Sequence, residues 1–130
     1  MMKSLIAIAC LSIALLSCNK VEHNLEGKWQ LKTVEAGGAV QTVDTVWYNF
    51  QTSLFEYQLY IPATGNYSTN FGYKTLDGDT KLELELINPP ASFLQLTDWT
   101  SPERTFTIDK STATRLVLSS DGKTYTFHKF

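Results

Sequence analysis

From residue 25 onward, inward and outward positions alternate along most of the chain, and this alternation predicts β-strands. The first such stretch is Leu25–Glu35, in which Trp29, Leu31 and Thr33 alternate with Lys28, Gln30 and Lys32. A period of two is typical of a half-buried strand. Gly27 lets the entering backbone pass close to a neighbour, and Trp29 then turns a large ring inward. We expect the later strands to pack around this one.

The same pattern recurs between turn signals and predicts further hairpins. Turns are expected where Gly, Asn and Asp accept positive φ: at Gly37-Gly38, Pro62–Asn66, Asp77–Asp79 and Ser120–Lys123. Residues 40–44 form a possible short strand, and the aromatic run 45–50 is either a strand or a lid. The predicted inward sets are Phe55, Tyr57 and Leu59; Tyr67, Thr69, Phe71 and Tyr73; Leu82, Leu84 and Leu86; Phe106 and Ile108; Leu116 and Leu118; and Tyr125 and Phe127.

Residues 88–103 interrupt this rhythm. Pro89, Pro90 and Pro102 exclude the segment from a central strand. Residues 91–97 could form one or two helical turns that carry Phe93, Leu94 and Leu96 inward, and Trp99 follows. An ordered insertion of this length is usually functional or a packed loop.

These elements predict one all-β domain of seven or eight antiparallel strands joined by short connections. Successive hairpins favour an up-and-down barrel, whose closure removes exposed strand edges. A two-sheet sandwich is the alternative, but it needs crossover connections that the chain does not suggest.

The N-terminal segment has a different character. A basic Lys3 precedes an apolar run over residues 5–16, which is the layout of a secretory signal peptide at residues 1–17. Leu15-Leu16-Ser17-Cys18 resembles the lipobox of bacterial lipoproteins, and this resemblance implies a lipid on Cys18. We then expect residues 18–24 to be a lipidated tether and residues 25–130 the folded domain. The resemblance implies a protein anchored in a bacterial cell envelope, at the outer membrane. An ordinary secretory signal that leaves a free thiol is the alternative.

Composition narrows the range of functions. The 130 residues carry a net charge of −2, and the basic residues do not cluster, so we expect no nucleic-acid partner. The only cysteines are Cys10 and Cys18, so no disulfide is expected in the domain. His128 is its single histidine, which gives no case for a metal, and we expect no cofactor. No nucleophile stands beside a base, so we expect no enzyme.

The first strand and the last third of the chain together resemble a known family. A Gly27-x-Trp29 that opens a small barrel resembles the lipocalin signature, and the motifs after Arg104 resemble those of lipocalin-like lipoproteins of Bacteroidetes. In lipocalins, an arginine from a late strand packs across the tryptophan of the first strand, and Arg115 is the residue that matches this role. The resemblance implies a lipocalin-like barrel that binds a small hydrophobic or amphipathic ligand.

The sequence therefore leaves two functions open. In the first, inward aromatic side chains line a ligand cavity, with Tyr57, Phe71 and Phe106 as walls, Trp99 at the mouth and Trp47 as a further contact. The alternative is that these rings simply fill the interior. In the second, a filled barrel is a protein-interaction or inhibitory module at the membrane, with the Trp47 and Trp99 segments as its contact surface.

Overall fold

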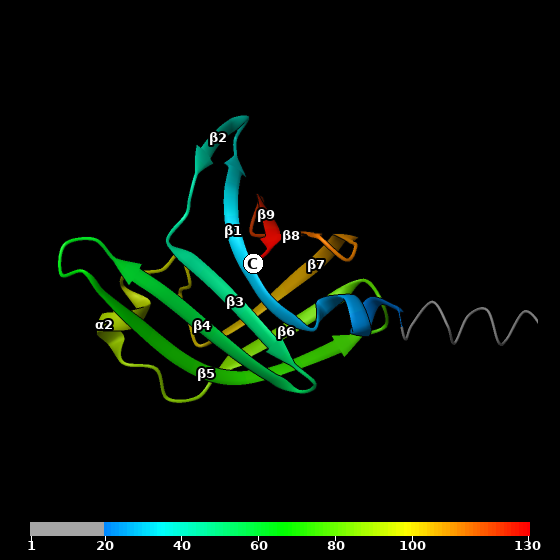
Figure 1. The fold of residues 1–130 in the computed structure, drawn as a ribbon, viewed down its shortest axis with the longest axis horizontal. Coiled ribbons are helices and arrows are strands. Elements are labelled where there is room, and N and C mark those ends of the chain that lie inside the picture. The colour runs from blue at the N-terminus through cyan, green and yellow to red at the C-terminus, as the bar shows by residue number, and fades with distance from the viewer. Residues whose placement is uncertain (1–19) are drawn as a thin grey trace, which may run out of the picture.

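The computed structural model describes residues 20–130, so the predicted signal peptide at residues 1–17 and the lipidation of Cys18 lie outside the described residues. Figure 1 shows strands wrapped around one core. Their bounds are β1 Gly27–Ala36, β2 Ala39–Thr42, β3 Val46–Gln51, β4 Leu54–Ile61, β5 Asn66–Asp77, β6 Lys81–Leu86, β7 Glu103–Ser111, β8 Arg115–Ser120 and β9 Lys123–Lys129, with the short helix α2 Ala91–Leu94 between β6 and β7.

The strands close into an eight-stranded antiparallel barrel. β1 pairs with β3, each strand from β3 to β8 pairs with the one that follows it, and β9 returns to pair with β1. The β1–β9 pairing runs from Trp29 opposite Lys129 to Ala36 opposite Lys123. The barrel prediction is therefore confirmed, and the sandwich is excluded.

β2 is the one strand that does not belong to the barrel wall. It pairs only with the second half of β1, and the two form a hairpin that projects from the barrel (Figure 1). Gly37 and Gly38 form its turn with φ values of 59° and 82°. Two successive positive φ angles define the tight turn that suits twisted strands, and glycine adopts them without strain.

One end of the barrel is covered by residues 20–25, which are helical. Leu25 is fully buried and Val21 packs against the core. The prediction that residues 18–24 form only a tether is therefore wrong over 20–24. The polar sequence concealed that two apolar side chains, four residues apart, lie on one face of a helical turn.

A bulge changes the inward face of β1 halfway along it. Trp29 and Leu31 point inward as predicted, but the register with β9 shifts between Leu31 and Thr33. Val34 therefore packs against the core, opposite Tyr125, and takes the place predicted for Thr33. A bulge inserts one extra residue, which reverses the sides of all the residues after it.

The predicted inward face of β5 is wrong. Tyr67, Phe71 and Tyr73 are exposed, while Gly72 and Lys74 lie on the buried face. A Cβ atom on Gly72 would lie 1.8 Å from the backbone oxygen of Glu85, so β5 and β6 approach too closely here for any other residue. The inward predictions for β4, β6, β8 and β9 are confirmed; in the loop, Phe93 is buried, whereas Leu96 is exposed.

Candidate functional site

Aromatic rings fill the barrel interior. Tyr48 lies at the centre, with its ring centroid 4.8 Å from that of Tyr57 and 4.9 Å from that of Phe127. Phe50, Phe55, Phe106 and Trp99 also surround it. Five hollows of the described residues 20–130 are lined mainly by residues of the outer face and of the barrel ends. An eight-stranded barrel is just wide enough for side chains to occupy it in this way.

Three of the predicted ligand contacts lie in this interior. Tyr57, Phe106 and Trp99 are buried and in mutual reach, with Trp99 5.6 Å from Tyr57 and 6.3 Å from Phe106 between ring centroids. The indole Nε1 of Trp99 donates a hydrogen bond of 3.1 Å to the hydroxyl of Tyr48. Trp99 therefore closes the barrel from the loop side.

The other two predicted contacts lie outside the barrel. Phe71 is exposed on the outer face of β5 and cannot be an interior wall. Trp47 faces away from the core, since its neighbours Tyr48 and Phe50 take the inward positions of β3. Its ring is covered by Tyr67 and Phe130, each with its ring centroid 5.9 Å away. Trp47 is therefore a packed residue of the outer surface.

Trp29 is buried at the barrel end that residues 20–25 cover. Its Nε1 donates a 2.9 Å hydrogen bond to the carbonyl oxygen of Leu25. The cation on its ring is Lys129, whose Nζ lies 4.6 Å from the ring centroid. The assignment of this role to Arg115 is wrong: Arg115 is exposed on β8, opposite His128, beside the inward Leu116. Lys129 lies two residues after the inward Phe127, a spacing that could have identified it.

The opposite end of the barrel, which we call the mouth, is closed by residues 87–102, the lid loop. Phe93 and Trp99 of this loop are buried against the aromatic core. Figure 1 places α2, which is part of this loop, at the side of the barrel away from residues 20–25. The lid loop therefore covers the interior with its own side chains.

An ion pair between buried Arg104 and half-buried Asp98 holds the lid loop to the barrel. Arg104, which is 8% exposed, donates from Nη1 to Oδ1 of Asp98 over 2.8 Å. Its Nη2 donates to the hydroxyl of Tyr125 over 2.6 Å, and that hydroxyl donates to Oδ2 of Asp98. Lys123 adds a second cation 3.5 Å from the same carboxylate oxygen. Asp98 is thus the loop's single anion in a site built by β7 and β9.

The pKa values of this network follow from its geometry. Burial raises the pKa of Asp98, but the hydrogen bond from Tyr125 and the charge of Arg104 more than offset it, so the pKa lies below its ordinary value. Burial raises the pKa of Tyr125, and Asp98 raises it further. Asp98 is therefore ionised and Tyr125 neutral at pH 7. Arg104 shares the inward period of Phe106 and Ile108, but no local pattern in the sequence indicates that Asp98 and Tyr125 reach it.

A second buried cation lies at the end covered by residues 20–25. Lys74 is 5% exposed, and its Nζ has no hydrogen-bond partner within residues 20–130. It lies 5.9 Å from the ring centroid of Phe50. Burial lowers the pKa of Lys74, while the carboxylates of Glu26 and Glu22 oppose that change. Within the described residues, no group of acidic, histidine or cysteine side chains could hold a metal ion.

Among residues 20–130, no helix is long and apolar enough to cross a membrane. No curated protein matches the chain. Two crystal structures resemble it, each with 28% sequence identity over 82% of this chain and 99% of the other. One is a lipocalin-like protein from Bacteroides uniformis ATCC 8492, with a TM-score of 0.76. The other is an uncharacterised protein from Bacteroides eggerthii DSM 20697, with a TM-score of 0.72.

The family model described as "Lipocalin-like domain" matches residues 11–130. This match includes the whole barrel, the helical residues 20–25 and the lid loop. The chain therefore belongs to the lipocalin-like domain family.

Proposed function

We propose that this protein is a lipid-anchored envelope lipoprotein whose barrel binds a small amphipathic molecule with an acidic group. The family supports a small-molecule-binding barrel. The observation that carries the proposal is the ion pair between Asp98 and Arg104, because it puts a carboxylate of the lid loop into a cation site of the barrel. A ligand carboxylate has the same shape and charge as this side chain.

The binding step is an exchange of one carboxylate for another. Opening of the lid loop would leave Arg104 with only the exposed carboxylate of Asp121, whose Oδ2 lies 3.7 Å from Nη2, so opening costs least when another anion takes the place of Asp98. Arg104 offers the planar, two-donor geometry that suits carboxylates, and the hydroxyl of Tyr125 adds a further donor. The acidic group would therefore bind at the mouth.

The apolar part of the ligand would take the space that Phe93 and Trp99 now fill. Once these rings leave, Tyr57 and Phe106 form walls of the interior, as binding sites for apolar molecules require. The hydroxyls of Tyr48 and Tyr57 would give such a ligand polar contacts inside.

The anchor is proposed on Cys18, which precedes in sequence the helical residues 20–25 that cover the end opposite the mouth. Residues 20–25 lie at the start of β1, whereas the lid loop follows the end of β6 (Figure 1). An anchored barrel would thus open away from the bilayer. Two or more acyl chains give stable membrane attachment. We expect Cys18→Ser to move the protein to the soluble fraction and the control Cys10→Ser to leave it with the membranes; membrane attachment of both variants would contradict the anchor.

Ligand binding is tested with a dansylated undecanoic acid and its methyl ester. We expect the wild type to bind the acid and the variant Asp98→Asn to bind it roughly tenfold more tightly, because the competing carboxylate has been removed. Asp109→Asn, on the exposed side of β7, is the control and should match the wild type. The ester should show no such gain.

Native mass spectrometry of the protein purified from its own host's membranes, with the acyl chains on Cys18 counted in the expected mass, would identify the natural ligand. An extra mass released by organic solvent is the expected result. A bare protein, together with equal affinity of the wild type and Asp98→Asn for the acid, would contradict the proposal.

The filled interior favours one other function, a protein-interaction or inhibitory module. Its predicted contact surface must change, however, because the rings of Trp47 and Trp99 are both buried. A bare protein in the mass measurement would leave this as the better proposal.

A further inference from the structure

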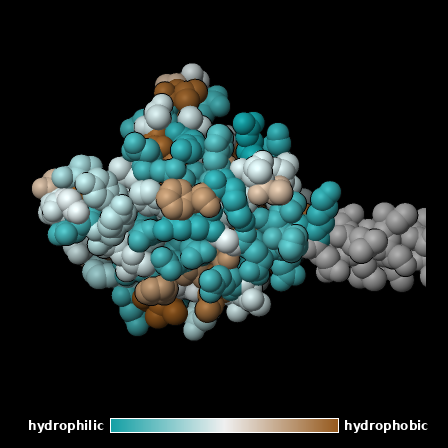
Figure 2. Space-filling view, viewed as in Figure 1, coloured by the Kyte–Doolittle hydropathy of each residue, from teal (hydrophilic) through white to brown (hydrophobic). Residues whose placement is uncertain are grey.

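Four large apolar side chains lie exposed together on the outer surface of β4 and β5 and at the end of β6. The exposed fractions are 53% for Leu54, 61% for Phe71, 51% for Tyr73 and 47% for Ile87. Leu54 pairs directly with Tyr73, and the N–H of Ile87 donates to the carbonyl oxygen of Phe71. We call these four residues the outer aromatic face. Apolar residues gather at the lower edge of the view in Figure 2, where β5 and the chain after β6 run in Figure 1.

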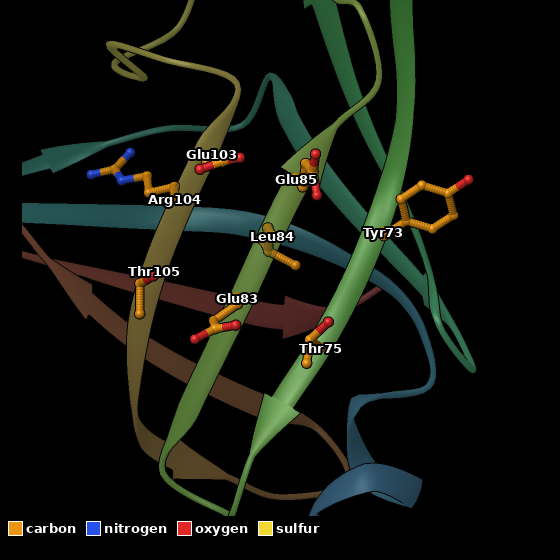
Figure 3. A pocket seen from close by; sticks show the side chains of 8 residues that line it. All are labelled: Tyr73, Thr75, Glu83, Leu84, Glu85, Glu103, Arg104 and Thr105. Carbon is orange, nitrogen blue, oxygen red and sulfur yellow. The ribbon is translucent and has the colours of Figure 1, made fainter.

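Hollows lie on both sides of Tyr73. One, of about 340 Å³, runs over β5, β6 and β7 beside Thr75, Glu83 and Thr105 (Figure 3). Another, of about 640 Å³, continues toward Ile87, Pro89 and Pro102. The outer aromatic face is therefore ridged, with space for side chains of another molecule.

The edges of these hollows carry three glutamates and one arginine, Arg104, which is paired with Asp98. Glu83, Glu85 and Glu103 lie side by side on β6 and β7 (Figure 3), and Glu56 on β4 pairs with Phe71. Glu85 lies directly opposite Glu103, an arrangement of like charges that weakens a sheet. None of these four glutamates forms an ion pair with another residue of the described range 20–130. Four carboxylates around exposed apolar side chains call for a partner with cations around apolar groups.

The fold fixes how such a partner can bind. At Tyr73, β5 is paired with Leu54 of β4 on one edge and with Glu85 of β6 on the other, so this part of the barrel has no free edge to which another strand could be added. Contact must therefore be made through side chains. The close approach of β5 and β6 at Gly72 holds Phe71 and Tyr73 on either side of it, facing outward.

We propose that the outer aromatic face is the docking site for a basic, apolar segment of a partner protein. Two other occupants are disfavoured by charge. An anionic membrane surface would be repelled by the four glutamates, and a second copy of this chain would bring the same carboxylates against each other. This site is separate from the barrel interior and does not depend on ligand binding there.

The test uses the full-length chain in its own host, with a photo-crosslinking phenylalanine analogue in place of Tyr73. The control carries the analogue in place of Thr126, which lies on β9 with its side chain opposite to the inward Tyr125 and Phe127. We expect a protein adduct at position 73 and not at 126, mapped by mass spectrometry to a segment with Lys or Arg beside apolar residues.

Charge removal provides the second measurement. The triple variant Glu83→Gln, Glu85→Gln and Glu103→Gln should lower the adduct yield roughly tenfold, and high salt should lower it in the wild type. Asp109→Asn, which removes an exposed carboxylate of β7 that lines neither hollow and takes no part in the proposed ligand site, should leave the yield unchanged. An adduct with lipid, an adduct with this chain itself, equal yields at both positions, or a yield that the triple variant keeps would each overturn the proposal.

Discussion

At the scale of single residues, the cation that contacts Trp29 shows that one sequence pattern can be met by two different residues. The resemblance to lipocalins predicts a cation over the ring of Trp29, and both Arg115 and Lys129 lie near that end of the barrel. Lys129 takes the role because it follows Phe127 on the inward side of β9, whereas Arg115 precedes Leu116 and points outward. Alternation identifies which residues share a face, and only a contact across the barrel shows which face is inside.

We predict that Lys129→Gln lowers the free energy of unfolding by about 0.5–1 kcal/mol, because the ring of Trp29 loses its cation. Arg115→Gln should change it by less than about 0.5 kcal/mol, as exposed substitutions do. Urea unfolding followed by tryptophan fluorescence measures both values. Equal losses in the two variants would contradict this assignment.

The residues of β5 have the opposite orientation to the one that their sequence predicts. Three aromatic residues at a period of two predicted a buried face, yet a glycine and a lysine occupy it. Neither residue signals burial by its type. Gly72 is buried because β6 passes too close for a side chain, and no local pattern records that distance.

At the scale of elements, the sequence predicts the lid loop as an ordered insertion, but it does not predict the ion pair that attaches this loop to the barrel. Prolines and the aromatic residues predicted a packed loop, and Phe93 and Trp99 confirm it. The pair of Asp98 and Arg104 joins residues of two elements, and the hydroxyl of Tyr125 comes from a third. Only the closed barrel brings β7 and β9 to the same loop.

Because the pKa of Asp98 in the lid loop is lowered, the free energy of unfolding should depend on pH. The pKa of Asp98 is lower in the folded than in the unfolded protein, so its contribution is fully present above the unfolded value of about 3.9 and is lost as the pH falls through the folded value. We predict that Asp98→Asn lowers the free energy of unfolding by about 1–3 kcal/mol at pH 7 and by clearly less near pH 3.

Urea unfolding at the two pH values measures this difference, with Asp109→Asn as the matched control on the exposed side of β7. The control should show no comparable loss at pH 7. A loss in Asp98→Asn that stays the same at pH 3 would mean that the carboxylate of Asp98 is not what holds the loop.

For the whole molecule, the barrel itself could be predicted from the sequence because each hairpin is local. Turn signals and a period of two specify most neighbouring pairs, and closure then needs the pairing of β1 with β3 and with β9. The helical residues 20–25 were missed because their burial depends on a barrel end that no local pattern describes. The outer aromatic face was missed for the same reason as the buried face of β5.

The aromatic interior has a consequence for how such barrels diverge. Its volume is set by side chains from many strands, while closure holds the backbone through hydrogen bonds that do not involve those rings. Exchanging one ring for a smaller side chain therefore opens space without rebuilding a strand, at a cost in stability. A few substitutions can therefore convert a filled barrel into one with a cavity, or the reverse. Ligand binding can be gained or lost in this way while selection on the outer surface stays unchanged.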